Sequence, residues 1–265
     1  MAQADDFTLN PGDMIADYRI EKVLGAGSFG VTYQAHEVAL DRRVAIKEYM
    51  PVQYARRDSA GTISSRNAET APTFEWGLDR FSEEARTLAQ FNHPNIVRVL
   101  RIVQGLNGTS YIVMEFLPGA NLETVVERDG PLPTGRFVEI FAQILDGMKA
   151  VHGIGILHRD LKPANIVLDE RGPVIIDFGA ARELAMQQKA GFSALVTDGF
   201  SPPEQYSSKN IQSPASDIYA LAATAHYLLS GEVPPPSAAR HAGEDMTPAA
   251  QLRGDLPADI AQAID

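Results

Sequence analysis

The chain has 265 residues, of which 45% are hydrophobic and 22% are charged, which is typical of a globular protein with one large domain or two lobes. Its formal net charge of -11 disfavours binding along a nucleic-acid backbone or an anionic membrane. The absence of cysteine excludes disulfides, thiolate metal ligands and a cysteine nucleophile. Residues 1–12 do not resemble a signal peptide, and no apolar run approaches the roughly 20 residues of a membrane helix. We therefore expect a soluble, cytoplasmic domain.

A glycine-rich stretch lies between two predicted strands near the start of the chain. Residues 18–24 and 31–37 have strand character. Gly25, Gly27 and Gly30 lie between them, so that backbone amides can approach a phosphate where no Cβ intervenes. A dinucleotide fold would require a helix directly after the glycines, and a Walker loop would require Gly-Lys-Ser/Thr; the sequence has neither. By itself the pattern is weak evidence of a nucleotide site.

The remaining predicted elements change from strands to helices along the chain. A third strand ends in Val44-Ala45-Ile46-Lys47, and residues 50–75 have the composition of an insertion with loop character. The other expected elements are, in order, a helix over 78–91, strands over 96–103 and 111–116 joined at Asn107-Gly108, a break at Leu117-Pro118-Gly119, and helices over 134–152 and 217–229.

One short stretch places a proton acceptor, a cation and an amide oxygen close together, in the sequence Leu157-His158-Arg159-Asp160-Leu161-Lys162-Pro163-Ala164-Asn165-Ile166. No helix or strand period requires that order. Phosphoryl transfer does require it, because its catalysis depends on positioning and on neutralising charge on phosphate. The apolar run 174–176 and then Asp177-Phe178-Gly179 follow, so two carboxylates and an amide are available for one magnesium-bound triphosphate.

Through these motifs the sequence resembles the protein kinase family, from about Tyr18 to the last residue. The resemblance implies an α+β, bilobal fold with a small antiparallel sheet and one main helix in the N-lobe and a mostly helical C-lobe. It divides the chain into an N-terminal extension at 1–17, an N-lobe at 18–116 that contains the insertion, and a C-lobe at 117–265. The C-lobe is shorter than is usual in the family, as if truncated at its C-terminal end.

The resemblance assigns roles to the residues of the loop and of the motif that follows it. Asp160 is expected to orient the attacking hydroxyl and to accept its proton late, and Lys162 to neutralise charge on the transferring phosphoryl group. Asn165 and Asp177 are expected to hold Mg2+, which prefers oxygen ligands. His158 is expected to be a packed structural residue and not an acid–base group.

The resemblance also implies an ATP site in the N-lobe. Lys47 is expected to hold the α- and β-phosphates, although the same strand would also suit an exposed lysine if it stood alone. Its partner is expected to be Glu84, because the spacing from Glu84 to Asn92-His93-Pro94 fits the family; the adjacent Glu83 is then solvated. The residues expected around the adenine and the phosphates are Leu24, Gly25, Gly27, Gly30, Thr32, Ala45, Lys47, Met114, Glu115, Leu117 and Val167.

A segment after Asp177 resembles the family's activation segment. Thr197 is expected to contact the catalytic aspartate and lysine, Ser193 falls at the usual phosphorylation position, and Arg159 is expected to meet a phosphate there. Asp217 is expected to anchor the catalytic loop, or to be a plain helix cap, or both. In the family, the glutamate at the position of Glu204 pairs with a later arginine, and no arginine of this sequence has the right context. A buried carboxylate without its partner is costly. We therefore expect that Glu204 is solvated, that a partner surface covers it, or that the domain is shortened.

The lysine two residues after Asp160 resembles serine/threonine kinases, and Glu48-Tyr49-Met50-Pro51 and residues 202–206 resemble bacterial members. The leading expectation is transfer of the γ-phosphate of ATP to Ser or Thr hydroxyls of a protein substrate, with Mg2+ and with autophosphorylation of the activation segment. Two alternatives stay open: a non-catalytic nucleotide-binding scaffold and a small-molecule kinase. No nucleic-acid partner is expected.

Overall fold

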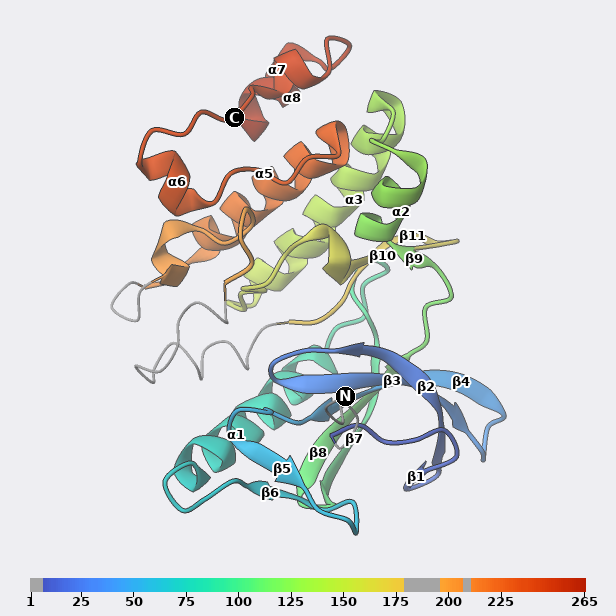
Figure 1. Cartoon of the computed structure of the whole chain (residues 1–265). Helices are drawn as coiled ribbons and strands as arrows, with labels where there is room; N and C mark the ends of the chain where they lie inside the picture. The colour runs from blue at the N-terminus through green and yellow to red at the C-terminus, as the bar shows by residue number, and fades with distance from the viewer. Residues whose placement is uncertain (1–6, 179–195, 207–210) are drawn as a thin grey trace. The chain divides into compact units, whose positions relative to one another are not determined.

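The computed structural model describes residues 7–178, 196–206 and 211–265, which fall into two compact units (Figure 1). The first unit contains residues 7–92 and 97–117. The second contains residues 93–96 and the described residues from Pro118 to Asp265. Together they have the protein-kinase-like, α+β composition that the sequence predicted, with an antiparallel sheet in one unit and mostly helices in the other.

The first unit is built on a six-stranded antiparallel sheet in the order β1-β2-β3-β4-β8-β7. The turn between β7 and β8 has φ of 52° at Asn107 and 72° at Gly108, the backbone geometry that tight hairpins require. The expected strands and this turn are present, although β7 begins after the expected residue 96. The strands are β1 Met14–Ile15, β2 Tyr18–Ala26, β3 Gly30–Glu37, β4 Arg42–Tyr49, β7 Val99–Leu106 and β8 Thr109–Glu115.

The two faces of this sheet are covered by different parts of the chain. Helix α1, Ala71–Leu88, packs on the face that carries Tyr49, whose ring centroid lies 5.5 Å from those of Phe74 and Phe81. Because side chains alternate along a strand, Lys47 lies on this same face and Glu48 on the opposite one. The opposite face is covered by a short hairpin, β5 Ala55–Arg57 and β6 Ile63–Ser65, and by residues 7–10.

The prediction that residues 50–75 have loop character is wrong for part of this range, although residues 58–62 and 66–70 lie outside helices and strands. The range contains the β5–β6 hairpin and the start of α1, which begins at Ala71 instead of residue 78 and ends at Leu88 instead of residue 91. Pro72 and Gly77 hide the helical pattern, but proline is tolerated in the first turn, where its missing N–H has no partner to lose. Packing of Phe74 against the sheet then stabilises the early turns.

The second unit is mostly helical. The expected helices are present as α3, Thr134–Gly153, and α5, Pro214–Ser230; α5 ends at Gly231, whose φ of 77° is the usual glycine C-cap. Helix α3 packs against α5 and against β11 of a three-stranded antiparallel sheet in the order β11-β10-β9. The other elements are β9 Ala120–Asn121, α2 Leu122–Asp129, the 3-10 turn η1 Pro163–Asn165, β10 Ile166–Asp169, β11 Gly172–Ile175, η3 Pro203–Tyr206, α6 Ser237–His241, α7 Ala249–Leu252 and α8 Ala258–Ile264.

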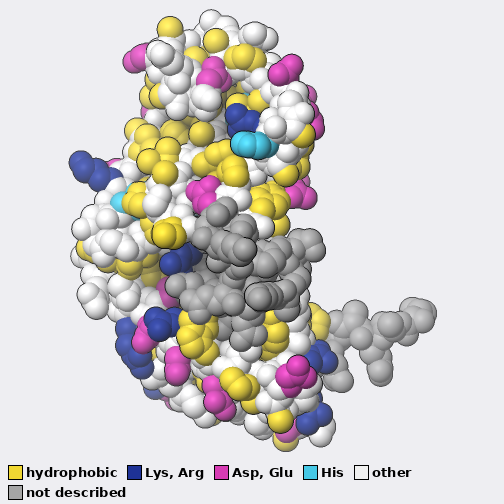
Figure 2. All heavy atoms as spheres, turned by 90° about the vertical axis from the view of Figure 1, so that its left-hand side faces the viewer, with side chains coloured by type: hydrophobic (Ala, Val, Ile, Leu, Met, Phe, Trp, Pro, Cys, Tyr) yellow, Lys and Arg dark blue, Asp and Glu magenta, His cyan; other side chains and the backbone are white. Residues whose placement is uncertain are grey.

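Two general surface properties can be read from the described residues. None of their helices is long and apolar enough to cross a membrane. On the face shown in Figure 2, Lys and Arg side chains are interspersed with Asp and Glu and do not form a stripe of one sign.

Candidate active site

The loop between α3 and β10 is held by a buried carboxylate from α5. Asp217, which is 1% exposed, accepts hydrogen bonds from the backbone N–H groups of His158 at 2.9 Å and of Arg159 at 2.8 Å. Its Oδ2 also lies 2.8 Å from His152 Nε2. Arg159 has φ 66°, a conformation that costs a non-glycine residue about 1–3 kcal/mol and persists where surrounding contacts impose it. The anchoring role expected for Asp217 is confirmed, and the N-cap of α5 is a different residue, Ser213.

Asp160 lies beside Lys162 and Thr197. Lys162 Nζ is 3.6 Å from Asp160 Oδ1, and Thr197 Oγ1 donates a hydrogen bond to the same oxygen at 3.3 Å. Lys162 Nζ donates in turn to Thr197 Oγ1 at 3.3 Å. The Asp160 and Lys162 side chains are 18% and 23% exposed, so both charged groups remain accessible. The expected contact of Thr197 with Asp160 and Lys162 is confirmed, and their catalytic roles stay a prediction.

The two residues expected to hold metal lie on segments that are joined by their backbones. Ile176 N–H donates to the carbonyl of Asn165 at 2.9 Å, and Asp177 follows directly with φ 57°. Asn165 Nδ2 donates to the backbone carbonyl of Asp160 at 2.8 Å, which fixes the amide and leaves Oδ1 to accept a ligand.

The donor set of Asn165 and Asp177 is chemically suited to Mg2+. Both side chains offer hard oxygen donors, which this cation prefers. Within the described part of the chain, no group of three or more His, Asp or Glu side chains is placed to hold a metal by itself. Magnesium is usually bound by one or two carboxylates together with substrate phosphates and water, so two protein ligands are sufficient here.

His158 is completely buried and links the loop between α3 and β10 to the residues that follow β11. Its Nε2 lies 3.0 Å from the carbonyl of Ile176, so this nitrogen must carry the proton, and the N–H of Asp160 donates to Nδ1 at 3.3 Å. The ring packs on Phe178 at 4.6 Å between centroids. Burial lowers the pKa of His158 below its ordinary value of 6.5, which keeps it neutral at pH 7. It is a packed structural residue, as the sequence predicted.

Strand pairing places several of the expected nucleotide-binding residues on one face of the first unit's sheet. Thr32 lies opposite Lys47 across β3 and β4, and Ala45 lies opposite Met114 across β4 and β8. Since α1 packs on this same face, Glu84 on that helix is on the same side of the sheet as Lys47.

The two adjacent glutamates of α1 differ in their surroundings. Glu84 is half-buried and Glu83 is exposed. Glu83 Oε2 accepts a hydrogen bond from Arg80 Nη1 at 2.8 Å, an exposed ion pair of the kind that contributes little to stability. These surroundings favour Glu84 as the partner of Lys47, which stays a prediction.

The glycine-rich hairpin joins β2 to β3, as expected. The space around the backbone differs from one of its glycines to the next. A Cβ on Gly30 would lie 2.2 Å from the carbonyl oxygen of Glu48, so only glycine allows β3 and β4 to approach here. Gly27 N–H donates to the Gly30 carbonyl at 2.9 Å, and the space around Gly25 is open. Nearby, Leu24 is 46% exposed.

The other residues expected around adenine are divided between the two units. Glu115 and Leu117 lie at the end of β8 and after it, and Glu115 N–H donates to the Arg98 carbonyl at 3.0 Å. Val167 lies on β10 of the second unit, where it pairs with Val174.

Comparison with known proteins is decisive about the family. The protein kinase domain family matches residues 18–253 of the chain. The chain belongs to the protein kinase family. Two similar curated proteins are the serine/threonine-protein kinase pkn3 of Myxococcus xanthus, 30% identical, and the serine/threonine-protein kinase PknB of Mycobacterium leprae, 32% identical. The matches cover 90% and 92% of this chain but only 43% and 38% of those proteins, so the chain spans less than half of their length.

Solved structures agree with the fold. A structure described as the apo form of PpkA-294 is 32% identical, with a TM-score of 0.86, and the match covers 97% of this chain and 92% of that one. The kinase domain of Mycobacterium tuberculosis PknI, solved as a point mutant, is 23% identical with a TM-score of 0.68, and the match covers 97% and 91%. The second likeness concerns the fold alone.

The sequence alone did not reveal the partner of Glu204 in this kinase domain. Glu204 Oε1 accepts a hydrogen bond from Ser216 Oγ at 2.5 Å. Ser216 is the third residue of α5 and forms the capping box with Ser213, but no local sequence pattern points to its contact with Glu204. The position of Ser193 lies outside the described residues.

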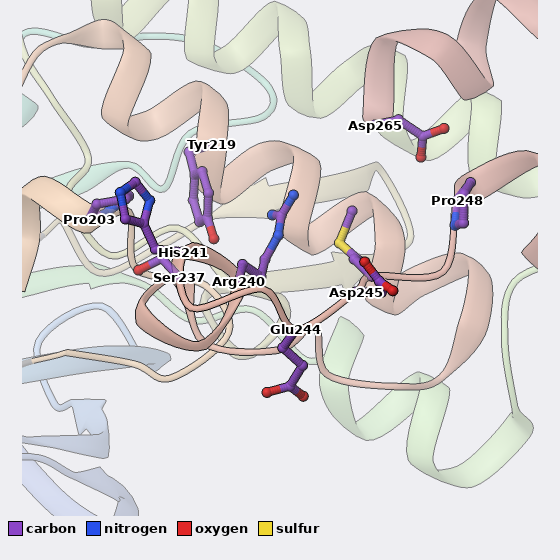
Figure 3. A pocket seen from close by; sticks show the side chains of 10 residues that line it. Pro203, Tyr219, Ser237, Arg240, His241, Glu244, Asp245, Pro248 and Asp265 are labelled. Carbon is purple, nitrogen blue, oxygen red and sulfur yellow. The ribbon is translucent and has the colours of Figure 1, made fainter.

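A pocket of about 460 Å³ in the second unit is lined by residues that the sequence reasoning did not select (Figure 3). Tyr219, Arg240 and His241 lie at one end of it, and the side chain of Glu244 points away from them. None of the predicted catalytic or nucleotide-binding residues lines this pocket.

Proposed function

We propose that this kinase domain transfers the γ-phosphate of ATP to serine or threonine hydroxyls of a protein substrate, with Mg2+ as the metal. The observation that carries the proposal is the cluster of Asp160, Lys162 and Thr197. Oδ1 of Asp160 forms an ion pair with Lys162 and accepts a hydrogen bond from Thr197. The curated relatives are themselves named serine/threonine-protein kinases. The scaffold alternative is not favoured, since every expected catalytic residue type is present.

The catalytic loop supplies positioning and charge. With one oxygen of Asp160 held by Thr197, the carboxylate is oriented to accept a hydrogen bond from the substrate hydroxyl and, late in the reaction, its proton. Lys162, whose Nζ lies 3.6 Å from Asp160 Oδ1, would neutralise charge on the transferring phosphoryl group. When bound, MgATP supplies the phosphoryl group and a divalent cation that balances the charge of the phosphates. Asn165 and Asp177 would hold that cation.

The first unit supplies the nucleotide contacts in this proposal. Lys47 would hold the α- and β-phosphates with Glu84 as its orienting partner, and the backbone amides of the glycine-rich hairpin would cover the phosphates. The adenine contacts stay those expected above. We place the reaction in the cytoplasm, where ATP and Mg2+ are abundant, and the net charge of -11 disfavours a nucleic-acid substrate.

The proposal is tested by transfer of radiolabel from γ-labelled ATP, with Mg2+, to the chain itself and to a generic protein substrate. We expect Asp160→Asn to lower kcat by about 10²- to 10⁴-fold, the usual contribution of a general base. Lys47→Met and Glu84→Gln should also lower activity, whereas the matched variant Glu83→Gln should leave it unchanged. Transfer that continues undiminished in Asp160→Asn and Lys47→Met would refute the proposal. A thermal shift with MgATP but no transfer to any protein would support the scaffold.

Mass spectrometry of the activation segment tests the regulatory part. Phosphate on Ser193 or Thr197 that depends on ATP and is absent from Asp160→Asn would support autophosphorylation.

A further inference from the structure

The carboxylate that directly follows Lys47 on β4 is buried on the side of the sheet away from the nucleotide-binding residues. Glu48 is 0% exposed, although neighbouring positions on that face are apolar. Tyr33 Oη donates to Glu48 Oε2 at 2.8 Å, and Tyr111 lies directly opposite Glu48 on β8. A buried carboxylate is costly unless it is paired and hydrogen-bonded, so its counterion must be built into the fold.

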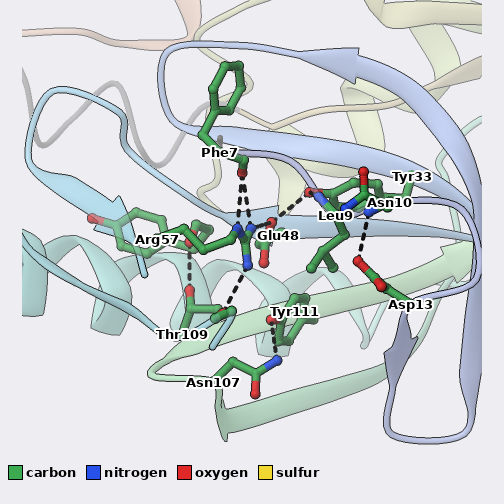
Figure 4. A network of polar contacts seen from close by, with 12 residues as sticks. Phe7, Leu9, Asn10, Asp13, Tyr33, Glu48, Arg57, Asn107, Thr109 and Tyr111 are labelled. Carbon is green, nitrogen blue, oxygen red and sulfur yellow. Dashed lines mark hydrogen bonds and ion pairs between the residues drawn. The ribbon is translucent and has the colours of Figure 1, made fainter. Parts of the chain in front are cut away.

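That counterion is Arg57, which comes from the hairpin inside the 50–75 insertion. Its Nη2 donates to Glu48 Oε2 at 2.6 Å, and the two side chains are 6% and 0% exposed (Figure 4). Burial opposes the charge on Arg57, but Glu48 more than offsets this, and the pKa of the guanidinium is raised. The guanidinium of Arg57 is therefore charged where it meets Glu48.

The remaining donors of Arg57 hold two further segments in place. Nε and Nη2 donate to the backbone carbonyl of Phe7 at 3.3 and 3.1 Å, and Nη1 donates to that of Gly61 at 3.1 Å. Leu9 N–H donates to Tyr33 Oη at 3.0 Å, so the N-terminal segment is bound to the same group of residues. Figure 4 shows the contacts that run from Phe7 to Arg57 and from Arg57 to Glu48. One planar guanidinium thus joins β4, the hairpin and the N-terminal segment.

We propose that Arg57 is a positioning residue for Lys47. Glu48 and Lys47 are adjacent on β4 and point to opposite faces, so fixing the Glu48 side chain from one side fixes the strand from which Lys47 extends on the other. This inference rests on the proposed function, in which Lys47 holds the phosphates of ATP. Positions of catalytic groups must be kept within a fraction of an ångström, since a displacement of 1 Å costs about 10²-fold in rate.

The test compares Arg57→Met with Arg56→Met, which removes the exposed neighbour on the same strand β5. We expect Arg57→Met to raise KM for MgATP by roughly 10- to 100-fold while KM for the protein substrate is unchanged, and Arg56→Met to change neither. Arg57→Lys keeps the charge but loses the forked geometry, so its KM for MgATP should be intermediate.

A purely structural role predicts a different result. Loss of folded protein lowers the maximal rate in proportion to the folded fraction and leaves both KM values unchanged. Because Arg57→Met leaves Glu48 buried without a counterion and can unfold the chain, the double variant Glu48→Gln/Arg57→Met serves as a second test. It should recover the melting temperature but keep the raised KM for MgATP. Wild-type KM for MgATP in a folded double variant and in Arg57→Lys would overturn the proposal.

The outcome can be separated from failure of the proposed function. If the wild-type chain transfers no phosphate, the proposed function fails, and the dissociation constant of MgATP measured by calorimetry replaces KM. A weaker MgATP complex in Arg57→Met and in the double variant, but not in Arg56→Met, still supports the positioning role. Equal dissociation constants in all folded variants would overturn it.

Discussion

Replacing Asp217 by asparagine tests how much the anchoring of the catalytic loop contributes. Asparagine keeps one oxygen, which can still accept from Arg159 N–H, but it presents an NH2 group where Oδ2 meets His158 N–H at 2.9 Å and His152 Nε2 at 2.8 Å. A hydrogen bond to a charged group contributes about 1.5–3 kcal/mol. The backbone N–H of His158 cannot bond to an NH2 group, whereas neutral His152 can change tautomer and accept from it, so we expect a loss of about 1.5–3 kcal/mol. If Asp217 acted only through its charge at the N-terminus of α5, it would contribute about 0.3–1 kcal/mol to stability.

The free energy of unfolding is measured in urea by far-UV circular dichroism, because the single tryptophan, Trp76, lies on α1 of the other unit and would not report on this one. The control is Asp259→Asn. Asp259 is also an acidic residue in the first turn of a helix, α8, but its side chain is exposed. We expect kcat of Asp217→Asn to fall by about 10²-fold, since Asp160 follows the anchored backbone directly. A loss of stability below about 1 kcal/mol, equal to that of the control, would show that the anchoring argument is wrong.

Two further predictions concern His158 and Gly30. The pKa of His158 is lowered in the folded protein, so the unfolded chain binds a proton first as the pH falls. The free energy of unfolding should therefore decrease below pH 6.5, by up to about 1.4 kcal/mol per pH unit. His158→Asn should remove this contribution, measured by urea unfolding at about pH 7.5 and 5.5. An unchanged slope in that variant would contradict the assignment. Gly30→Ala should destabilise the fold by about 1–3 kcal/mol, because the new Cβ would meet the Glu48 carbonyl oxygen. The control Gly25→Ala adds its Cβ in open space and should be nearly neutral. Equal melting temperatures of the two variants would refute this prediction.

Local features of the fold could be predicted from the sequence because their causes are local. The hairpin at Asn107-Gly108 requires two residues with positive φ, and these residue types adopt that conformation readily. The long apolar face of α3 and the glycine that ends α5 are equally visible in the sequence.

Features that depend on packing could not be predicted. The early turns of α1 contain Pro72 and Gly77, and they are helical because Phe74 packs against Tyr49 of a strand more than twenty residues earlier. Nothing about Arg57 in the sequence distinguishes it from the neighbouring Arg56, yet one is buried against Glu48 and the other is exposed. Strands of three residues, such as β5 and β6, also carry too little pattern to detect.

By itself, the sequence determined which residues are proposed for the reaction, since the residue types and spacing around Asp160 and Asp177 specify what those groups can bind and neutralise. Only the tertiary structure decided which buried groups contact the segments that carry the proposed site residues: Asp217 accepts from the backbone just before Asp160, and Arg57 pairs with Glu48, the residue after Lys47. The physical reason is that a catalytic group is recognised by its own chemistry, whereas a buried partner is defined by the contacts and desolvation that folding brings about.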